Sequence, residues 1–174
     1  RTYQDGGDRY DQLLGGDGNL IAELNGLSLD LFSARVERLD VGPFDYAALT
    51  YSLNSQREER VNQGGNGNPT AVIGYEPERT TVNGLNGAVT SQLSRRQTLT
   101  VGGDVYFETF TSEAFNVTPP TNAVSPRRPR VPDGATYRQG GMYAQTAYEA
   151  LPDRVRLVGS VRFGGASYEE GAGI

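Results

Sequence analysis

The residue types that most often carry out catalysis are scarce in this chain. Its 174 residues include no His and no Cys, which removes the commonest general base and the thiolate nucleophile or metal ligand. Adjacent carboxylates occur as Glu58–Glu59 and Glu169–Glu170, but both pairs lie in polar, loop-like sequence. Solvated loop charges explain these pairs better than a catalytic acid and base. We therefore assign no catalytic residue and expect the chain not to be an enzyme.

Two polar segments have the chemistry to bind ions. The first is a Gly-rich stretch with four carboxylates, Asp5, Asp8, Asp11 and Asp17. Oxygen-rich loops can hold Ca²⁺, but the calcium-loop spacing with its terminal Glu is absent, so the sequence predicts no metal site and no cofactor. The second is a Pro-rich stretch with three guanidiniums, Arg127, Arg128 and Arg130. They could contact an anionic ligand or a lipid phosphate, although loop solubility is the simpler explanation.

The composition restricts both the partners and the fold. Sixteen basic and 21 acidic residues give a net charge of -5, which argues against nucleic acid as a partner. No apolar run approaches the roughly 20 residues that a membrane-spanning helix needs. Only 36% of the residues are apolar, and 23 are Gly, so a thick two-sided core would be hard to fill. If the chain crosses a membrane, it must therefore cross it with β-strands.

Alternation of apolar and polar side chains predicts about six long strands. It is clearest around 98–111, where Leu99, Val101 and Phe107 oppose Thr, Asp and Glu side chains. The predicted strand ranges are 19–41, 44–56, 80–93, 98–111, 135–150 and 155–168. In the first range the apolar phase changes after Leu31, so we expect a β-bulge near Leu31–Phe32.

The connections between these strands alternate in length. Short turns are predicted near residues 42, 95 and 153, and long polar segments at 1–18, 57–79 and 112–134. In a meander, successive connections fall at opposite ends of the sheet, so the short turns share one side. This asymmetry, with dyad alternation along each strand, is typical of outer-membrane barrels. The sequence predicts an all-β, antiparallel up-and-down meander that forms part of a transmembrane β-barrel in the outer membrane of a Gram-negative-type bacterium.

Position along the strands selects candidate membrane-facing and lumen-facing residues. Three aromatic residues lie about eight to eleven positions past their short turns on the apolar face, and Tyr148 lies close to a short turn. A preference of aromatics for strands would also place them there, but their similar depths favour girdles at the two membrane interfaces. The predicted outer girdle is Tyr51, Phe107 and Phe163, and the inner girdle includes Tyr148. The predicted lumen-facing charges are Arg35, Asp104, Glu108, Glu149, Arg156 and Arg162.

Several short motifs carry a family resemblance. The stretches TVGGDVYFE, PDGATYR, YAQTAYE, PDRVRL and GSVRF resemble the barrel motifs TFGGDYY, PDGSxYR, YAQDEW, DRL and GLRY of TonB-dependent outer-membrane receptors. The closest resemblance is to the large receptors with a carboxypeptidase-regulatory-like N-terminal domain. It is strongest from Gln97 to Phe163 and departs at Thr146, where the family usually has Asp, and at GSVRF.

The resemblance implies active uptake of a ligand across the outer membrane. In this family a barrel of about 22 strands surrounds a plug, and energy arrives through TonB. No plug or TonB box is recognisable in residues 1–174. We therefore expect a partial barrel domain whose partners are outer-membrane lipid, the rest of the barrel and plug in a parent chain, the TonB complex through that plug, and an unknown ligand.

Three alternatives stay open at this point. A passive porin-like or structural outer-membrane barrel would lack a plug upstream in the parent gene. An outer-membrane barrel enzyme is disfavoured for this chain by the absence of His. A soluble lipocalin-like or sandwich meander is disfavoured because the apolar faces hold many Ala and Gly, which make a thin core for strands this long.

Overall fold

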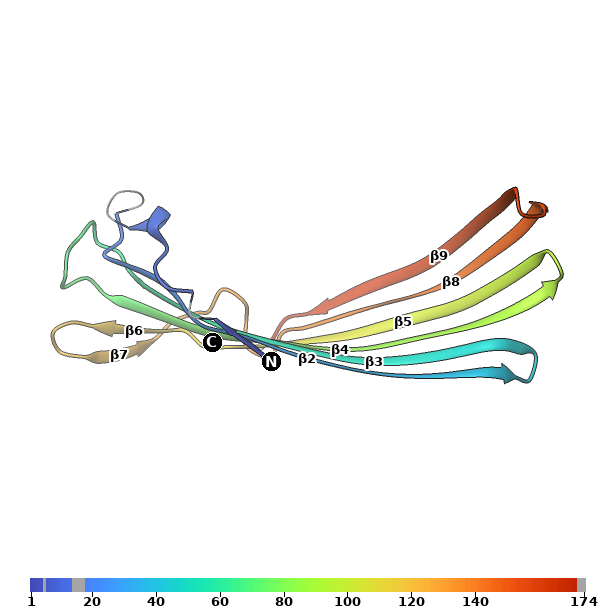
Figure 1. Ribbon diagram of the computed structural model, residues 1–174. Helices are drawn as coiled ribbons and strands as arrows, with labels where there is room; N and C mark the ends of the chain where they lie inside the picture. Colours follow the sequence, from blue (N-terminus) through green and yellow to red (C-terminus); the bar gives the residue numbers. More distant parts are fainter. Residues whose placement is uncertain (5, 14–17, 172–174) are drawn as a thin grey trace.

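A single antiparallel sheet dominates the computed structural model, which describes residues 1–4, 6–13 and 18–171 (Figure 1). The long strands are β2 (Ile21–Val41), β3 (Phe44–Gln63), β4 (Ile73–Ser94), β5 (Gln97–Ser112), β8 (Thr136–Leu151) and β9 (Val155–Glu169). Their order in the sheet is their order in the chain, and each pairs antiparallel with the next. The predicted up-and-down meander of about six long strands is confirmed, and the sheet stays open, with β9 at one edge.

Short elements occupy the segments predicted as loops. The strand β1 (Thr2–Gln4) pairs with β2, and a 3₁₀ turn covers Tyr10–Gln12. Between β5 and β8, β6 (Phe115–Thr118) and β7 (Ala123–Pro126) form a hairpin, and β6 also pairs with β4. The predicted loops 1–18 and 112–134 therefore contain regular structure that is too short to show alternation.

The three tight turns lie together at one end of the sheet, and the long connections lie at the other end (Figure 1). Left-handed backbone conformations close the first and third turns: φ is 54° at Asp40, 60° at Gly42 and 55° at Asp153. Asp and Gly are the residues that adopt this conformation at least cost. The predicted asymmetry between turns and loops is therefore present in the structure.

Two strands are longer than predicted. We expected the second strand to end at residue 56 and the third to begin at residue 80, but β3 runs to Gln63 and β4 starts at Ile73. The ladder continues through pairs such as Val61 with Tyr75. The charged run 57–60 on β3, and Gly74 and Pro77 on β4, interrupt the alternation of apolar and polar side chains, so that signal disappears while the backbone pairing continues. The predicted loop 57–79 is thus wrong for most of its length, since only residues 64–72 separate the strands.

The predicted β-bulge near Leu31–Phe32 is wrong. Pairing between β2 and β3 is continuous through these residues, and the irregularity lies between Asn25 and Ser28, next to Gly26 with φ 60°. Leu31 and Phe32 are 65% and 57% exposed and point to opposite faces of the sheet. The ladder with β3 fixes the register here, so a change of apolar phase did not require a change of register.

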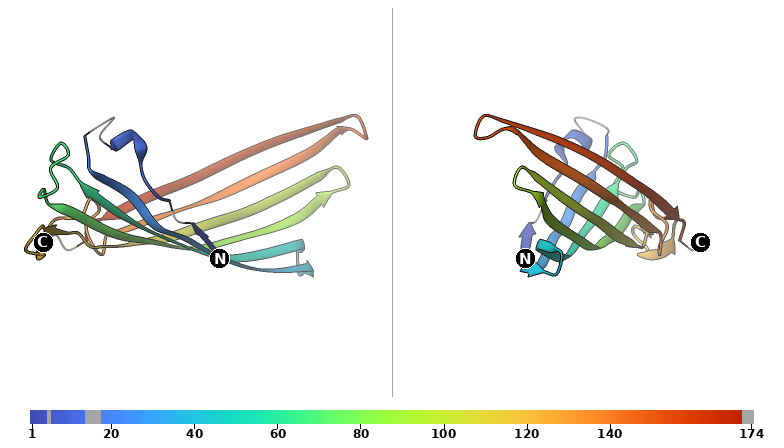
Figure 2. Two further views of the ribbon diagram at one scale, coloured as in Figure 1. Left: turned by 60° about the vertical axis from the view of Figure 1, so that its left-hand side comes forward. Right: turned by 90° about the vertical axis from the view of Figure 1, so that its right-hand side faces the viewer.

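Buried side chains concentrate at the loop end of the sheet. They include Ala22, Val61, Ala114 and Ala135 among apolar residues and Gln63, Glu76 and Ser112 among polar ones. Tyr75 stacks on Phe115 there, with ring centroids 5.2 Å apart. Toward the tight turns the sheet is one layer thick, as Figure 2 shows from two directions. The core thus holds the long connections in place and leaves the faces of the strands uncovered.

Candidate functional site

The strand register sorts the side chains onto two faces with different chemistry. Residues paired directly across an antiparallel ladder point to the same side of the sheet. One row is apolar and consists of Ala34, Tyr51, Leu85, Val105 and Gly140. The adjacent row points the other way and consists of Arg35, Thr50, Asn86, Asp104 and Gly141. The alternation predicted from the sequence therefore produces one apolar face and one polar face.

The apolar face is a wide exposed surface, which we call the apolar belt. It consists of Val36, Leu49, Tyr51, Leu85, Val89, Val101, Val105, Phe107, Met142, Val161 and Phe163. Leu49 is 52% exposed, Met142 69% and Phe163 75%. Soluble monomers rarely leave so many adjacent large apolar side chains uncovered. The belt is therefore a surface built to meet an apolar environment.

Arginines border the apolar belt on both sides. Arg38 pairs with Ala47 toward the tight turns, and Arg57 pairs with Arg79 toward the long connections. From Ala47 to Arg57 the strand advances ten residues, which is about 33 Å at a rise of roughly 3.3 Å per residue. A strand tilt of about 35–45° reduces this to roughly 23–27 Å, against an apolar band about 25 Å tall in outer-membrane barrels.

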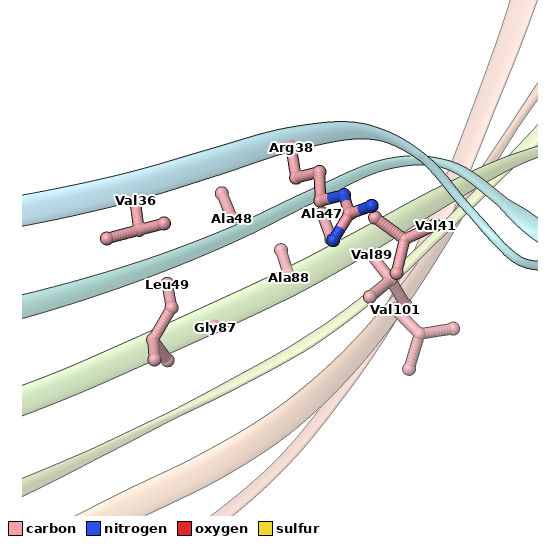
Figure 3. Close-up of a pocket in the computed structure, with 10 residues that line it drawn as sticks. All are labelled: Val36, Arg38, Val41, Ala47, Ala48, Leu49, Gly87, Ala88, Val89 and Val101. Atoms are coloured by element: carbon pink, nitrogen blue, oxygen red, sulfur yellow. The ribbon is translucent and has the colours of Figure 1, made fainter.

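The belt is hollowed near the tight turns (Figure 3). A shallow groove of about 410 Å³ lies over β2–β5, where the small residues Ala47 and Gly87 adjoin Leu49 and Val101. Arg38 lies at the turn side of this groove, with its guanidinium over Ala47. No carboxylate or hydroxyl side chain lines the groove. A hydrophilic solute would therefore find no hydrogen-bond partner there other than Arg38.

All four candidate girdle residues lie on the apolar face. Phe163, Tyr51 and Phe107 occupy three rows of this face that are two residues apart along the strands, and Tyr148 pairs with Leu157 near the turn. The rows incline in a membrane when strands tilt, so the row alone does not fix the depth of a side chain. The assignment of these residues to two girdles stays a prediction.

Phe32 is an aromatic neighbour that sequence reasoning missed. Its ring centroid lies 6.3 Å from that of Tyr51 on the next strand. The hydroxyl of Tyr51 donates a hydrogen bond to Oδ1 of Asn83 at 2.7 Å, so its polar end is satisfied beside the apolar belt. The alternation of β2 contained the signal for Phe32, but the bulge expected at this residue obscured it.

The six candidate lumen-facing charges share the polar face, and the structure brings two of them together. The guanidinium of Arg162 on β9 reaches across β8 and donates two hydrogen bonds to the Asp104 carboxylate on β5, at 2.7 and 3.0 Å. The crossing passes over Gly141, where a Cβ would lie 2.8 Å from Nη2 of Arg162. Such a bidentate pair fixes the relative orientation of the two side chains as well as pairing their charges.

The other four candidate charges are not gathered into one site. Glu108 lies between Val82 and Tyr137 in the ladder. Arg35 donates to the hydroxyl of Tyr46 at 2.8 Å and pairs with Glu37. Glu149 and Arg156 are directly paired in the ladder, yet the described residues show no ion pair between them. Whether these charges line a lumen stays a prediction.

Two tyrosines of the polar face lie over glycines of the preceding strand. A Cβ on Gly84 would be 2.6 Å from the ring of Tyr106, and a Cβ on Gly102 would be 2.6 Å from the ring and hydroxyl of Tyr143. Each Tyr is directly paired with its Gly in the ladder. With Arg162 over Gly141, three long side chains lean over glycines of the strand before them. The sequence signal would have been these Gly–Tyr pairs, which appear only when the register is known.

Two of the three arginines in the Pro-rich stretch are occupied within the chain. The side chain of Glu76 is 3% exposed and forms ion pairs with Arg127 at 3.3 Å and Arg130 at 3.5 Å. Its other oxygen accepts the backbone N–H of Arg130 at 2.7 Å. Arg127 and Arg130 therefore anchor their segment to β4, a role that the sequence did not predict, and their expected roles in loop solubility or anion contact stay predictions. Arg128 is exposed.

Nearby on β4, outside the apolar belt, Glu78 is directly paired with Glu58. Burial raises the pKa of the Glu78 carboxyl, and the negative charge of Glu58 raises it further, while Arg60 acts in the opposite direction.

Within the described ranges, no group of three or more acidic side chains is arranged to hold a metal ion. Of the four aspartates considered for calcium, Asp5 and Asp17 lie outside those ranges. The same ranges contain no helix that is long and apolar enough to cross a membrane.

These features define the chain as an open antiparallel β-sheet with one apolar and one polar face. No protein-family model matches it, and no curated protein matches its sequence. Its fold is similar to that of the copper transporter OprC, with a TM-score of 0.69 and 13% sequence identity. The match covers 88% of this chain and 24% of the OprC chain. The chain therefore spans about a quarter of that transporter, and the likeness concerns the fold.

Proposed function

We propose that this chain is a wall segment of an outer-membrane β-barrel transporter of the TonB-dependent kind, which takes up a ligand across the outer membrane. The observation that carries the proposal is the apolar belt. It is exposed, it is backed by a polar face, and arginines border it at a separation that matches the apolar band of such barrels.

Two further observations support the transporter class. The fold is similar to a quarter of the OprC chain, whose name describes a copper transporter. The motifs between Gln97 and Phe163 resemble the barrel motifs of TonB-dependent receptors. In this proposal the remaining strands, the plug, the TonB contact and the ligand site belong to the parent chain.

A pair of substitutions on adjacent residues tests which face meets lipid. Leu85 is 43% exposed in the middle of the apolar belt, and Asn86 points to the polar face. Leu85→Arg in the parent chain should cost about 2–4 kcal/mol of stability in lipid vesicles, the range for a cation near the midplane of a barrel wall. Asn86→Arg, which lies beside Asp104 in the ladder, should cost less than about 1 kcal/mol.

Denaturant unfolding of the protein refolded into vesicles measures both values. Equal costs for the two variants, or a larger cost for Asn86→Arg, would contradict a lipid-facing belt. A monodisperse, detergent-free solution of the folded chain would contradict it as well.

Conductance separates this proposal from a passive barrel. The parent chain in a planar bilayer should pass little current until a denaturant removes the plug, because the plug fills the lumen. A steady open-pore current without denaturant would favour the porin-like alternative.

A further inference from the structure

Two arginines occupy an unusual place at the loop-side border of the apolar belt. Arg57 on β3 and Arg79 on β4 are directly paired across the ladder and point to the same face as the belt. Both are exposed. Like charges placed directly opposite each other in a sheet repel and are destabilising. A negative charge between or beside the two guanidiniums would therefore stabilise the pair.

No carboxylate of the described chain neutralises this pair. Neither guanidinium has an acidic oxygen within 4.0 Å among the described residues, although eight other ion pairs form there. Two carboxylates lie on the same face nearby: Glu59 on β3, which forms no ion pair with either guanidinium among the described residues, and Asp30 on β2, which is paired with Arg1. Arg57 and Arg79 thus keep their charge available to a partner outside the chain.

The pair also borders an open hollow. A space of about 340 Å³ is lined by Arg57, Arg79, Pro77 and Thr111, with Glu78 and Glu113 also at its border. The guanidiniums supply forked donors, which match the geometry of a phosphate group, and Thr111 supplies a hydroxyl. The two carboxylates would repel an anion and so favour the arginine side of the hollow for its binding.

We propose that Arg57 and Arg79 bind the phosphate group of an anionic lipid headgroup. This inference rests on the proposed function, since it places the border of the belt at a membrane interface. Toward the turn, the same face of β3 continues from Arg57 through Ser55 to Leu53 and Tyr51. A lipid with its phosphate on the two guanidiniums would lay its hydrocarbon chain along this path. A free phosphate would make no use of the belt, so the occupant is an amphiphile.

The test compares lipid retention by the parent chain in nanodiscs of phosphatidylcholine. The discs contain a small fraction of bis-phosphorylated lipid A or of its dephosphorylated form, and native mass spectrometry counts the lipids that stay bound. Arg57→Gln/Arg79→Gln should lose about tenfold in preference for the phosphorylated lipid, since charge-assisted contacts are lost. Arg95→Gln/Arg96→Gln removes the same charge in a tight turn at the other end of the sheet and should leave the preference unchanged.

Two further measurements distinguish a lipid headgroup from a free anion. Arg57→Lys/Arg79→Lys keeps the charge but loses the forked geometry, so it should keep part of the preference. Excess inorganic phosphate should leave the lipid bound. Displacement by phosphate alone would assign the site to a free anion and overturn the lipid assignment.

Equal retention by the Gln/Gln variant and the wild type would also overturn it. If the Gln/Gln variant does not fold, the wild-type ratio of the two lipids and the Lys/Lys variant decide. Failure of the wild type to insert into a bilayer would contradict the proposed function, whereas insertion without headgroup preference would contradict only this inference.

Discussion

At the scale of single residues, the polar face is organised around glycines. Gly84, Gly102 and Gly141 each leave room for a long side chain from the following strand. A hydrogen in place of a methyl group lets a tyrosine ring or a guanidinium lie flat against the backbone. The absence of a side chain at these glycines therefore makes room for the tyrosine and arginine side chains of the next strand.

Filling one of these spaces should destabilise the sheet. Gly84→Ala would bring a Cβ within 2.6 Å of the Tyr106 ring and the Ser52 hydroxyl, so the ring must leave its place. We expect a loss of about 1–3 kcal/mol in the free energy of unfolding. Gly165→Ala is the matched control, because a Cβ there meets nothing within 4 Å. Equal unfolding midpoints for the two variants would show that the tyrosine does not depend on the glycine.

Glu78 should make the loop end of the sheet sensitive to pH. Its pKa is raised in the folded state by burial and by Glu58, so the folded chain holds this proton more tightly than the unfolded chain. Stability should therefore be greatest below the ordinary glutamate pKa and should fall as the pH rises through the raised one. Glu78→Gln should flatten this decline, as measured by unfolding midpoints from pH 4 to pH 8. An unchanged slope in Glu78→Gln would assign the pH dependence to other groups.

Sequence reasoning reached part of this residue-level structure. Alternation placed Asp104 and Arg162 on one face, because it needs only local spacing. Their hydrogen bonds could not be predicted, since they join residues 58 positions apart and depend on the register of three strands. The pairing of Tyr106 with Gly84 was out of reach for the same reason.

At the scale of elements, β3 and β4 extend beyond the residues in which apolar and polar side chains alternate. Alternation marks the segments that have unlike surroundings on their two faces, and it predicted the turn-side parts of β3 and β4 well. Beyond Arg57 and Arg79 the alternation is interrupted, but the backbone pairing continues, and Val61 and Tyr75 add apolar packing at the loop end. The loop end could not be predicted because its core is assembled from segments far apart in sequence.

Glu76 should control the mobility of the segment that follows β7. Glu76→Gln removes the charge that holds Arg127 and Arg130 and weakens the contact to the Arg130 backbone. Hydrogen bonds to a charged group are worth about 1.5–3 kcal/mol, so this segment should open more often. Limited trypsin digestion should then cut after Arg130 several times faster than in the wild type. Glu169→Gln is the control because that carboxylate is 65% exposed, and equal digestion of both variants would contradict the anchoring role.

At the scale of the whole molecule, the fold class followed from three local signals: strand length, alternation, and the difference between turns and loops. None of these signals determines closure, and the sheet is open. Among the described residues only β8 pairs with β9, a strand of 15 residues, so its other edge presents backbone groups that could pair with a further strand.

Hydrogen exchange tests what lies against this edge. The N–H groups of β9 that point away from β8 should be protected in the parent chain as strongly as those of β4, because a neighbouring strand would accept their hydrogen bonds. In the isolated 174-residue chain in detergent they should exchange much faster. Rapid exchange at these amides in both samples would show that β9 is a true edge and would contradict the barrel wall.

The gathering of all three tight turns at one end has a consequence for how such a wall can change its size. Each hairpin brings the chain back to the side from which it departed. A hairpin can therefore be duplicated or deleted without inverting the direction of any other strand. Every such step would change the circumference of a barrel built from this sheet by two strand widths, about 10 Å of sheet. The number of strands would change by two each time, and the apolar and polar faces would never be exchanged.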